Sequence, residues 1–223
     1  MGYVFDWSVV SNWLTATAIL SGLQLTLLVS LMAMLLGSFI GMIVAFARLW
    51  GPGWLRSIAY VYVDLFRATP PLVQLIWIYY VGPMLLGINL SAVAAGVIAL
   101  SLNAGAFLSE VFRAGLQSID KGQTDASIVL GLTRRQSLYH IILPQALKRV
   151  APAVTNIFMS LIKDSALLSV IGVTEVTYNM QSMVNQTFRP FELYTALAVV
   201  YLILTYPLSI ITTILERHFK EKE

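Results

Sequence analysis

Long apolar runs separated by short polar stretches dominate this chain. The runs cover residues 20–47, about 55–81, about 90–112, about 151–173 and 194–215. A helix needs roughly 20 predominantly apolar residues to cross a bilayer, and each run is long enough. The pattern therefore predicts an all-α membrane protein with five transmembrane helices. Because five crossings are an odd number, we expect the two termini on opposite sides of the membrane.

The composition supports this interpretation. Of the 223 residues, 58% are hydrophobic and only 11% are charged, which is far from the composition of a soluble domain. Little sequence remains outside the apolar runs, so we expect a single transmembrane domain over residues 1–223. No Lys or Arg precedes Arg48. The first run therefore lacks the basic start of a signal peptide, and we expect it to be retained as a helix.

Basic residues are concentrated at alternate connections between the runs. They flank the first connection, crowd the third between residues 113 and 149, and recur in the tail from Arg217. The N-terminal segment and the second connection have none. Lys and Arg accumulate on the cytoplasmic side of membrane proteins. We therefore expect the N-terminus outside and the C-terminus in the cytoplasm.

The third connection, at about residues 116–148, is polar and has helical periodicity. A first short helix is expected over residues 125–130, with Gly131 ending it. A second is expected over residues 133–143, with its first residue, a threonine, as the N-cap and its end before Pro144. The second helix has one apolar stripe, formed by Leu138, Ile141 and Ile142. An amphipathic hairpin of this kind either lies on lipid headgroups or fills a groove on a partner protein.

Two cations fall inside the apolar runs. Arg67 follows Arg56 by eleven residues, which places it roughly 16 Å into the membrane, and Lys163 reaches a similar depth in the fourth run. A charge at this depth is costly unless it is paired or hydrated. Pro70 and Pro71 remove backbone donors beside Arg67, and a broken helix is tolerated there only where its carbonyls meet protein or water. Transporters place ligands at such breaks, but a structural kink with Arg67 in a fixed ion pair explains the pattern equally well.

A polar stripe marks the fourth run. It consists of Asn156, Ser160, Lys163 and Asp164, with Ser165 beside them. The spacing of three and four residues places the first four on one helical face, which we expect to face inward. A small zwitterion has one carboxylate and one ammonium group, which Arg67, Lys163 and Asp164 match in sign. The alternative is that these charges neutralise one another, or pair with Glu110, as a gate.

Other polar residues inside the runs are weaker candidates. Thr69 and Gln74 flank the two prolines, and we assign them to the same substrate site. Asn103 and Glu110 lie seven residues apart on one helical face. They either line the pathway or form hydrogen bonds between helices. Glu110 and Arg113 are expected to pair, and Asn103, Glu110 and Arg113 are candidates for the pathway or a gate.

Several ordered motifs resemble those of one transporter family. The loop has Gln123, Asp125, Ala126, Leu130, Gly131, Ile141, Leu143, Pro144, Gln145 and Ala146, and further motifs are FRATPPLVQ at 66–74, EVFRAG at 110–115, KGQ at 121–123 and LIKDSAL at 161–167. Together they resemble the EAA loop and flanking motifs of permease subunits of binding-protein-dependent ABC importers, in the branch for polar amino acids such as histidine, glutamine and arginine. Where the family usually has Glu-Ala-Ala, this chain has Asp125, Ala126 and Ser127, which keeps the charge on a shorter side chain.

This resemblance implies a fold, a set of partners and a mechanism. It implies the transmembrane fold of type I ABC importers and a location in the bacterial inner membrane. The implied partners are a second permease, identical or paralogous, two cytoplasmic ATPase subunits and an extracytoplasmic amino-acid-binding protein, which would dock near a short surface helix within residues 174–192. The loop would be a coupling helix that transmits closure of the ATPase and drives alternating access. The residues expected to couple to the ATPase are Gln123, Asp125, Ala126, Leu130, Gly131, Arg134 and Arg135.

Other functional classes fit the sequence less well. The chain has no Cys and only His140 and His218, and it lacks GxSxG, HExxH and phosphate-loop motifs. We therefore expect no catalytic site, metal, cofactor or nucleic-acid partner. An ion-coupled secondary transporter or channel subunit would explain the charges inside the membrane, but it would explain neither the cytoplasmic hairpin nor the lack of an inverted repeat. Because the predicted site offers few carboxylates apart from Asp164, neutral or acidic amino acids are favoured over cationic ones.

Overall fold

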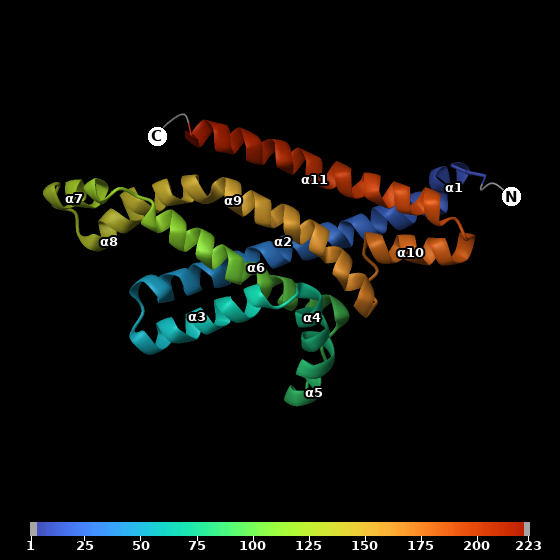
Figure 1. Ribbon diagram of the computed structural model, residues 1–223, viewed down its shortest axis with the longest axis horizontal. Coiled ribbons are helices and arrows are strands. Elements are labelled where there is room, and N and C mark those ends of the chain that lie inside the picture. The colour runs from blue at the N-terminus through green and yellow to red at the C-terminus, as the bar shows by residue number, and fades with distance from the viewer. Residues whose placement is uncertain (1–3, 221–223) are drawn as a thin grey trace.

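The computed structural model describes residues 4–220, without the side chains of residues 13–14 and 218–220, and this part of the chain is helical throughout with short connections (Figure 1). The long helices are α2 (Trp13–Trp50), α3 (Gly53–Ala68), α6 (Ala92–Gln117), α9 (Leu143–Asp164) and α11 (Pro190–Lys220). The shorter ones are α1 (Ser8–Ser11), α4 (Pro71–Ile76), α5 (Gly82–Leu86), α7 (Lys121–Val129), α8 (Arg134–Ser137) and α10 (Val176–Thr187), with the π-helical turns η1 (Trp77–Val81) and η2 (Leu138–Ile142) and the 3₁₀ helix η3 (Ser165–Ile171).

The prediction of five transmembrane helices is confirmed, with one of them broken. In the described residues, four helical segments are long and apolar enough to cross a membrane: Thr15–Trp50, Ala92–Gln117, Arg134–Ile171 and Pro190–Arg217. A fifth crossing results if the pair Gly53–Ala68 and Pro71–Leu86, bent by 109°, counts as one span. The bend lies at the two prolines, where the sequence predicted a break.

The prediction that the second loop helix ends before Pro144 is wrong. Residues 134–171 form one continuous helical segment, which widens into the π turn η2 just before Pro144. A proline lacks the N–H that an α-helix needs and clashes with the carbonyl four residues earlier. A π turn shifts the hydrogen bond by one residue and relieves both problems. The helix that contains the fourth span therefore begins in the loop, at Arg134, rather than near residue 151.

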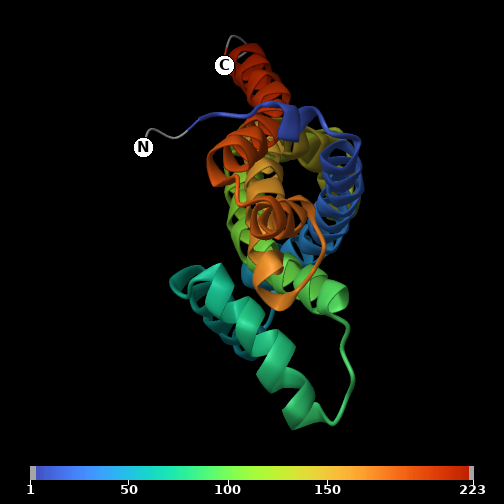
Figure 2. The same ribbon diagram turned by 90° about the vertical axis from the view of Figure 1, so that its right-hand side faces the viewer.

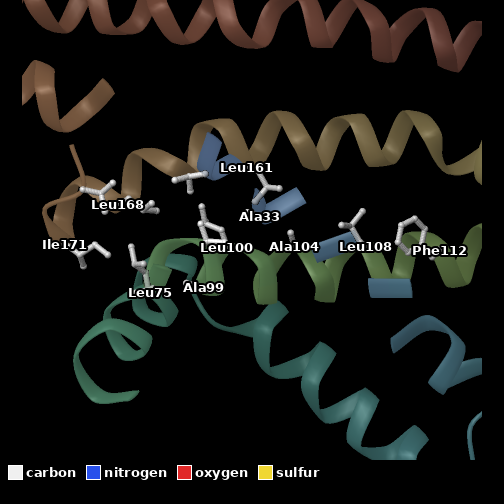
Figure 3. Close-up of a cluster of buried hydrophobic side chains, with 14 of the residues drawn as sticks. Ala33, Leu75, Ala99, Leu100, Ala104, Leu108, Phe112, Leu161, Leu168 and Ile171 are labelled. Carbon is white, nitrogen blue, oxygen red and sulfur yellow. The ribbon is translucent and has the colours of Figure 1, made fainter. Parts of the chain in front are cut away.

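The core lies where α2 packs along α6 and α9. Small residues allow α2 and α6 to approach closely, because a Cβ on Gly41 would lie 2.8 Å from the Leu108 Cβ and 3.0 Å from the Gly105 carbonyl oxygen. Such small-residue contacts are typical of helix pairs in membranes. Figure 3 shows a row of buried side chains along α6 facing Leu161 of α9 and Ala33 of α2.

The remaining elements extend from this core in two directions. Helix α3 packs on α6, and α4 and α5 then turn away from the bundle (Figures 1 and 2). The hairpin of α7 and α8 lies at one end of the molecule with the last turns of α11, whereas α1 and α10 lie at the other (Figure 1). The first and the last described helices, α1 and the end of α11, thus lie at opposite ends of the bundle (Figure 1).

The short helix predicted within residues 174–192 is α10, and its N-cap is a buried carboxylate that the sequence did not single out. Glu175 is fully buried. It accepts hydrogen bonds from the Tyr178 N–H at 2.8 Å and from the Thr26 and Tyr201 hydroxyls at 3.3 Å each. Burial raises the pKa of Glu175 above its usual value. This residue ties α10 to both α2 and α11.

Candidate functional site

Two amide side chains hold the helix break together. In a continuous helix, the Phe66 carbonyl would accept the N–H of residue 70, but Pro70 has none. Instead, Gln74 Nε2 donates to the Phe66 carbonyl at 2.8 Å and to the Thr69 carbonyl and hydroxyl at 2.9 and 2.7 Å. Asn103 Nδ2 donates to the Phe66 carbonyl at 3.2 Å and to Gln74 Oε1 at 3.0 Å. Thr69, Gln74 and Asn103 are therefore joined in one network that satisfies the broken backbone.

We expect Asn103→Leu to destabilise the protein by about 1–3 kcal/mol, because it leaves Gln74 Oε1 without a donor in a buried position. Thermal unfolding of the purified membrane complex would measure the loss. Ser101→Ala is the matched control on the same helix, because among the described residues the Ser101 hydroxyl donates only to the Val97 carbonyl of its own helix. Equal stability of the two variants would contradict a role for Asn103 in holding the break.

Glu110 collects three arginines at the edge of α6. Its carboxylate lies 2.6 Å from Arg48 Nη1, 2.7 Å from Arg113 Nη2 and 3.6 Å from Arg67 Nη1. The predicted pair of Glu110 and Arg113 is confirmed. The sequence did not indicate that Arg48 belongs to this cluster. Only 5% of the Arg48 side chain is exposed, and its guanidinium lies 4.3 Å from the centre of the Tyr60 ring. One carboxylate faces three cations, so the cluster keeps an excess of positive charge.

Arg67 is the most loosely held of the three arginines. Its side chain is 46% exposed, and its guanidinium lies 5.5 Å from the centre of the Phe107 ring. Phe107 begins a stripe on α6 that the rest of the chain leaves open: Phe107, Ala114 and Ser118 are exposed and Val111 is half-buried. Their spacing of three and four residues places them on one helical face. Arg67 thus lies at the edge of an open wall along α6.

The other edge of this wall is α9. A cavity of about 590 Å³ is lined by Val111, Ala114 and Gly115 of α6 and its C-cap Ser118, by Arg149, Val150, Pro152, Ala153 and Asn156 of α9, and by Glu216 of α11. It is a groove that follows the same α6 stripe toward the loop end of the molecule. Asn156, which the sequence placed in the substrate site, lies on its rim.

The polar stripe of α9 does not face into the packed helices of this chain, contrary to the expectation. Asn156, Ser160 and Lys163 are exposed, Asp164 is half-buried, and Ser165 is buried. The reason is that α9 buries its apolar faces against α6 and α11, which leaves the polar face uncovered. Because α6 lies between α3 and α9 (Figures 1 and 2), Arg67 on α3 and Lys163 on α9 approach α6 from opposite sides.

The loop is a braced hairpin. The buried hydroxyls of Ser127 and Ser137 are joined by a hydrogen bond of 2.6 Å between α7 and α8. Gly131 has a φ of +76°, and this left-handed turn lets the Leu132 N–H donate to the Ser127 carbonyl at 3.0 Å. Thr133 caps α8 as predicted, in a capping box with Gln136. Helix α7 begins at Lys121, four residues before the expected start.

The tip of the hairpin exposes apolar side chains. Ile128 is 60% exposed, Val129 87% and Leu130 74%. The residues expected to couple to the ATPase, namely Gln123, Asp125, Ala126, Leu130, Gly131, Arg134 and Arg135, are all exposed. Gln123 accepts a hydrogen bond from Gln145 Nε2 at 3.2 Å, and the Arg135 guanidinium lies 5.8 Å from the Tyr139 ring centre. The hairpin therefore presents an apolar patch with charged residues around it.

Comparison with known proteins identifies relatives of this chain. Residues 37–221 match the family described as "Binding-protein-dependent transport system inner membrane component". The chain is 37% identical over 218 residues to the glutamine transport system permease protein GlnP of Escherichia coli strain K12, which covers 97% of this chain and 98% of that protein. The permease GlnP of Shigella flexneri matches with the same identity and coverage.

Solved structures share the fold. A crystal structure of an amino acid ABC transporter with histidines superposes with a TM-score of 0.87 at 34% identity, covering 97% of this chain and all of that one. An inward-facing structure of the MetNI methionine ABC transporter gives a TM-score of 0.74 at 21% identity, covering 92% of this chain and 98% of that one. The resemblance inferred from the motifs is confirmed. The chain belongs to the inner membrane components of binding-protein-dependent transport systems and has the fold of a type I ABC importer permease.

Proposed function

We propose that this chain is the transmembrane permease subunit of an ATP-driven importer of amino acids, and that glutamine is its substrate. The glutamine permeases GlnP are 37% identical over nearly the whole chain. The charged residues Arg67, Lys163 and Asp164 match the charges of a zwitterion in sign. Only one of the three is a carboxylate, which leaves none for a cationic side chain. Residues 1–223 act as one permease domain, with the N-terminus outside and the C-terminus and hairpin in the cytoplasm.

The proposal includes a full set of partners. A second permease, identical or paralogous, covers the wall along α6 together with Arg67 and the polar stripe of α9, because polar residues inside a membrane are not left facing lipid. Two ATPase subunits bind the hairpins of the two permeases. An extracytoplasmic binding protein delivers the amino acid at the end of the molecule where α1 and α10 lie.

The observation that carries the proposal is the exposed apolar tip of the hairpin. An apolar patch on a polar loop marks a contact with another molecule, and the groove of an ATPase subunit would cover Ile128, Val129 and Leu130. The hairpin is also built to transmit force. Helix α8 continues without interruption through η2 and α9 to Lys163, roughly 40 Å away. Movement of the hairpin would therefore reach the middle of the membrane through a rigid element.

The substrate follows the open wall along α6. Polar groups reach it from both sides, from Arg67 on α3 and from Asn156, Ser160, Lys163 and Asp164 on α9. Thr69, Gln74 and Ser165 lie next to these residues and hold the local backbone in place. Glu110 and Arg113, with Asn103 at the break, act as the gate toward the loop end. Alternating access would then open the wall to one side of the membrane at a time.

Dependence on partners tests this function. We expect that proteoliposomes with the permease alone will not accumulate glutamine, and that adding the ATPase subunit and a glutamine-binding protein will give uptake that requires ATP. A binding protein loaded with an unrelated ligand is the control and should give no uptake. Accumulation by the permease alone, driven by an ion gradient, would contradict the proposal and favour a secondary transporter.

A further inference from the structure

Helix α3 carries an acidic residue inside the membrane that no motif singled out. Asp64 lies three residues before Arg67, on the same helical face. Its side chain is exposed, and among the described side chains no hydrogen bond or ion pair reaches its carboxylate. Arg67 is close along the helix but directs its guanidinium to Glu110 at 3.6 Å instead. Asp64 and Arg67 are therefore an acid and a base one helical turn apart that do not pair with each other.

The position of Asp64 rules out contact with lipid. Counted from Arg56, it lies roughly 12 Å into the membrane, where an unpaired carboxylate is strongly disfavoured. Ala59 and Val63 mark the face of α3 that is buried against the bundle, and the exposed Ile58, Val61 and Leu65 mark the face that is free for lipid. At about 100° per residue, Asp64 lies between these two faces, on the side of Arg67. Because Arg67 contacts Phe107 of α6, Asp64 faces the same side as the wall along α6, where a polar pathway or a charged partner would cover it.

Arg67 has donors to spare for a ligand. The Glu110 oxygens are engaged at 2.6 Å by Arg48 and at 2.7 Å by Arg113, so the charge of Glu110 is balanced without Arg67. A guanidinium has five N–H donors and favours bidentate contact with a carboxylate. A ligand carboxylate would replace a loose contact rather than break a strong one.

Together, Asp64 and Arg67 present one acceptor group and one donor group. Side chains three residues apart on a helix have Cβ atoms about 5–6 Å apart, and both side chains can converge on a small ligand. An α-amino acid has an ammonium and a carboxylate on the same carbon. We propose that Asp64 binds the α-ammonium group of the transported amino acid while Arg67 binds its α-carboxylate.

This assignment rests on the proposed function. It gives α3 and α9 different roles in binding the substrate. The head group common to all α-amino acids is held at α3, and the exposed stripe of α9, with Ser160 and Lys163, faces the variable side chain. Preference for an amino acid over its analogue without the amino group then depends on Asp64, whereas preference among amino acids does not.

The test measures that preference directly. Binding of radiolabelled glutamine, and its competition by 4-carbamoylbutanoate, which lacks the amino group, is measured on the permease and ATPase complex without binding protein. We expect Asp64→Asn to weaken glutamine binding about 10–100-fold, as for loss of a hydrogen bond to a charged group. Binding of the analogue should change little, so the preference should collapse. Asp64→Glu should keep most of it.

The control is Asp6→Asn, which removes the charge of a half-buried carboxylate outside the spans that accepts hydrogen bonds from Ser8. It should leave the preference unchanged. An assembled Asp64→Asn complex with the wild-type preference would overturn the assignment but leave the proposed function intact. Dissociation of the two permeases in Asp64→Asn, with Asp64→Glu still assembled, would overturn it in favour of a subunit contact. A wild-type complex that binds no amino acid would overturn the proposed function as well.

Discussion

Replacing Gly131 with valine will cut ATP-driven uptake by about five- to thirty-fold while leaving the permease in the membrane. The residue has a φ of +76°, a conformation that costs a β-branched side chain about 1–2 kcal/mol or more. A free-energy difference of this size lowers the population of the native turn by the five- to thirty-fold given above. The strain acts on the turn that lets Leu132 N–H bond the Ser127 carbonyl. The hairpin would then lose the rigid geometry through which the apolar tip moves α8 and α9.

The measurement is uptake and ATP hydrolysis by the complete transporter in proteoliposomes. We expect Gly131→Val to retain basal hydrolysis but to lose its stimulation by loaded binding protein. Gly87→Val is the matched control, because Gly87 has a similar φ of +65° after α5 and lies outside the hairpin. If the two variants lose uptake equally, or if Gly131→Val transports normally, the hairpin does not couple the permease to the ATPase.

The parts of the structure that the sequence predicted depend on local chemistry. Gly131 ends α7 because a left-handed turn needs glycine, and Thr133 caps α8 because its hydroxyl can accept a backbone N–H. The break after Arg67 follows from two prolines that lack donors. Each of these features depends on residues only a few positions apart in the sequence, so the sequence alone is enough to predict it.

Contacts between distant segments could not be predicted in the same way. Glu110 lies 62 residues from Arg48, and no periodicity links them. Asn103 lies 29 residues from Gln74, and its bonds form only because α3 breaks beside α6. Pro144 predicts a helix end because proline usually stops a helix, but the π turn before it allows the helix to continue. In each case the packing of other helices decides the outcome.

The orientation of the polar stripe on α9 shows a different limit. The spacing of Asn156, Ser160, Lys163 and Asp164 correctly implied one face, but periodicity says nothing about what covers that face. In this chain α6 and α11 cover the apolar sides of α9 and leave the stripe open. A face that is polar, inside a membrane and uncovered is what one half of a shared pathway would present.

Replacing Glu110 with glutamine will destabilise the protein by about 2–4 kcal/mol, which is among the largest effects expected of a single substitution in this chain. The change keeps the shape of the side chain but removes the charge that Arg48 faces at 2.6 Å. Because only 5% of the Arg48 side chain is exposed, water cannot replace the lost partner. Breaking a buried pair costs more than the pair is worth, since it leaves a buried charge uncompensated.

Chemical denaturation of the purified complex in detergent would measure this loss. Arg48→Met in the Glu110→Gln background should recover most of it, because it removes the buried charge and leaves an apolar side chain of similar length. Arg113→Gln is the control: 30% of the Arg113 side chain is exposed, and Glu110 keeps Arg48, so we expect a loss of about 1 kcal/mol or less. If Glu110→Gln is as stable as Arg113→Gln, or if Arg48→Met gives no recovery, the ion pair between Arg48 and Glu110 does not stabilise the contact of α2 with α6. The arginines of the cluster would then act only in the transport pathway.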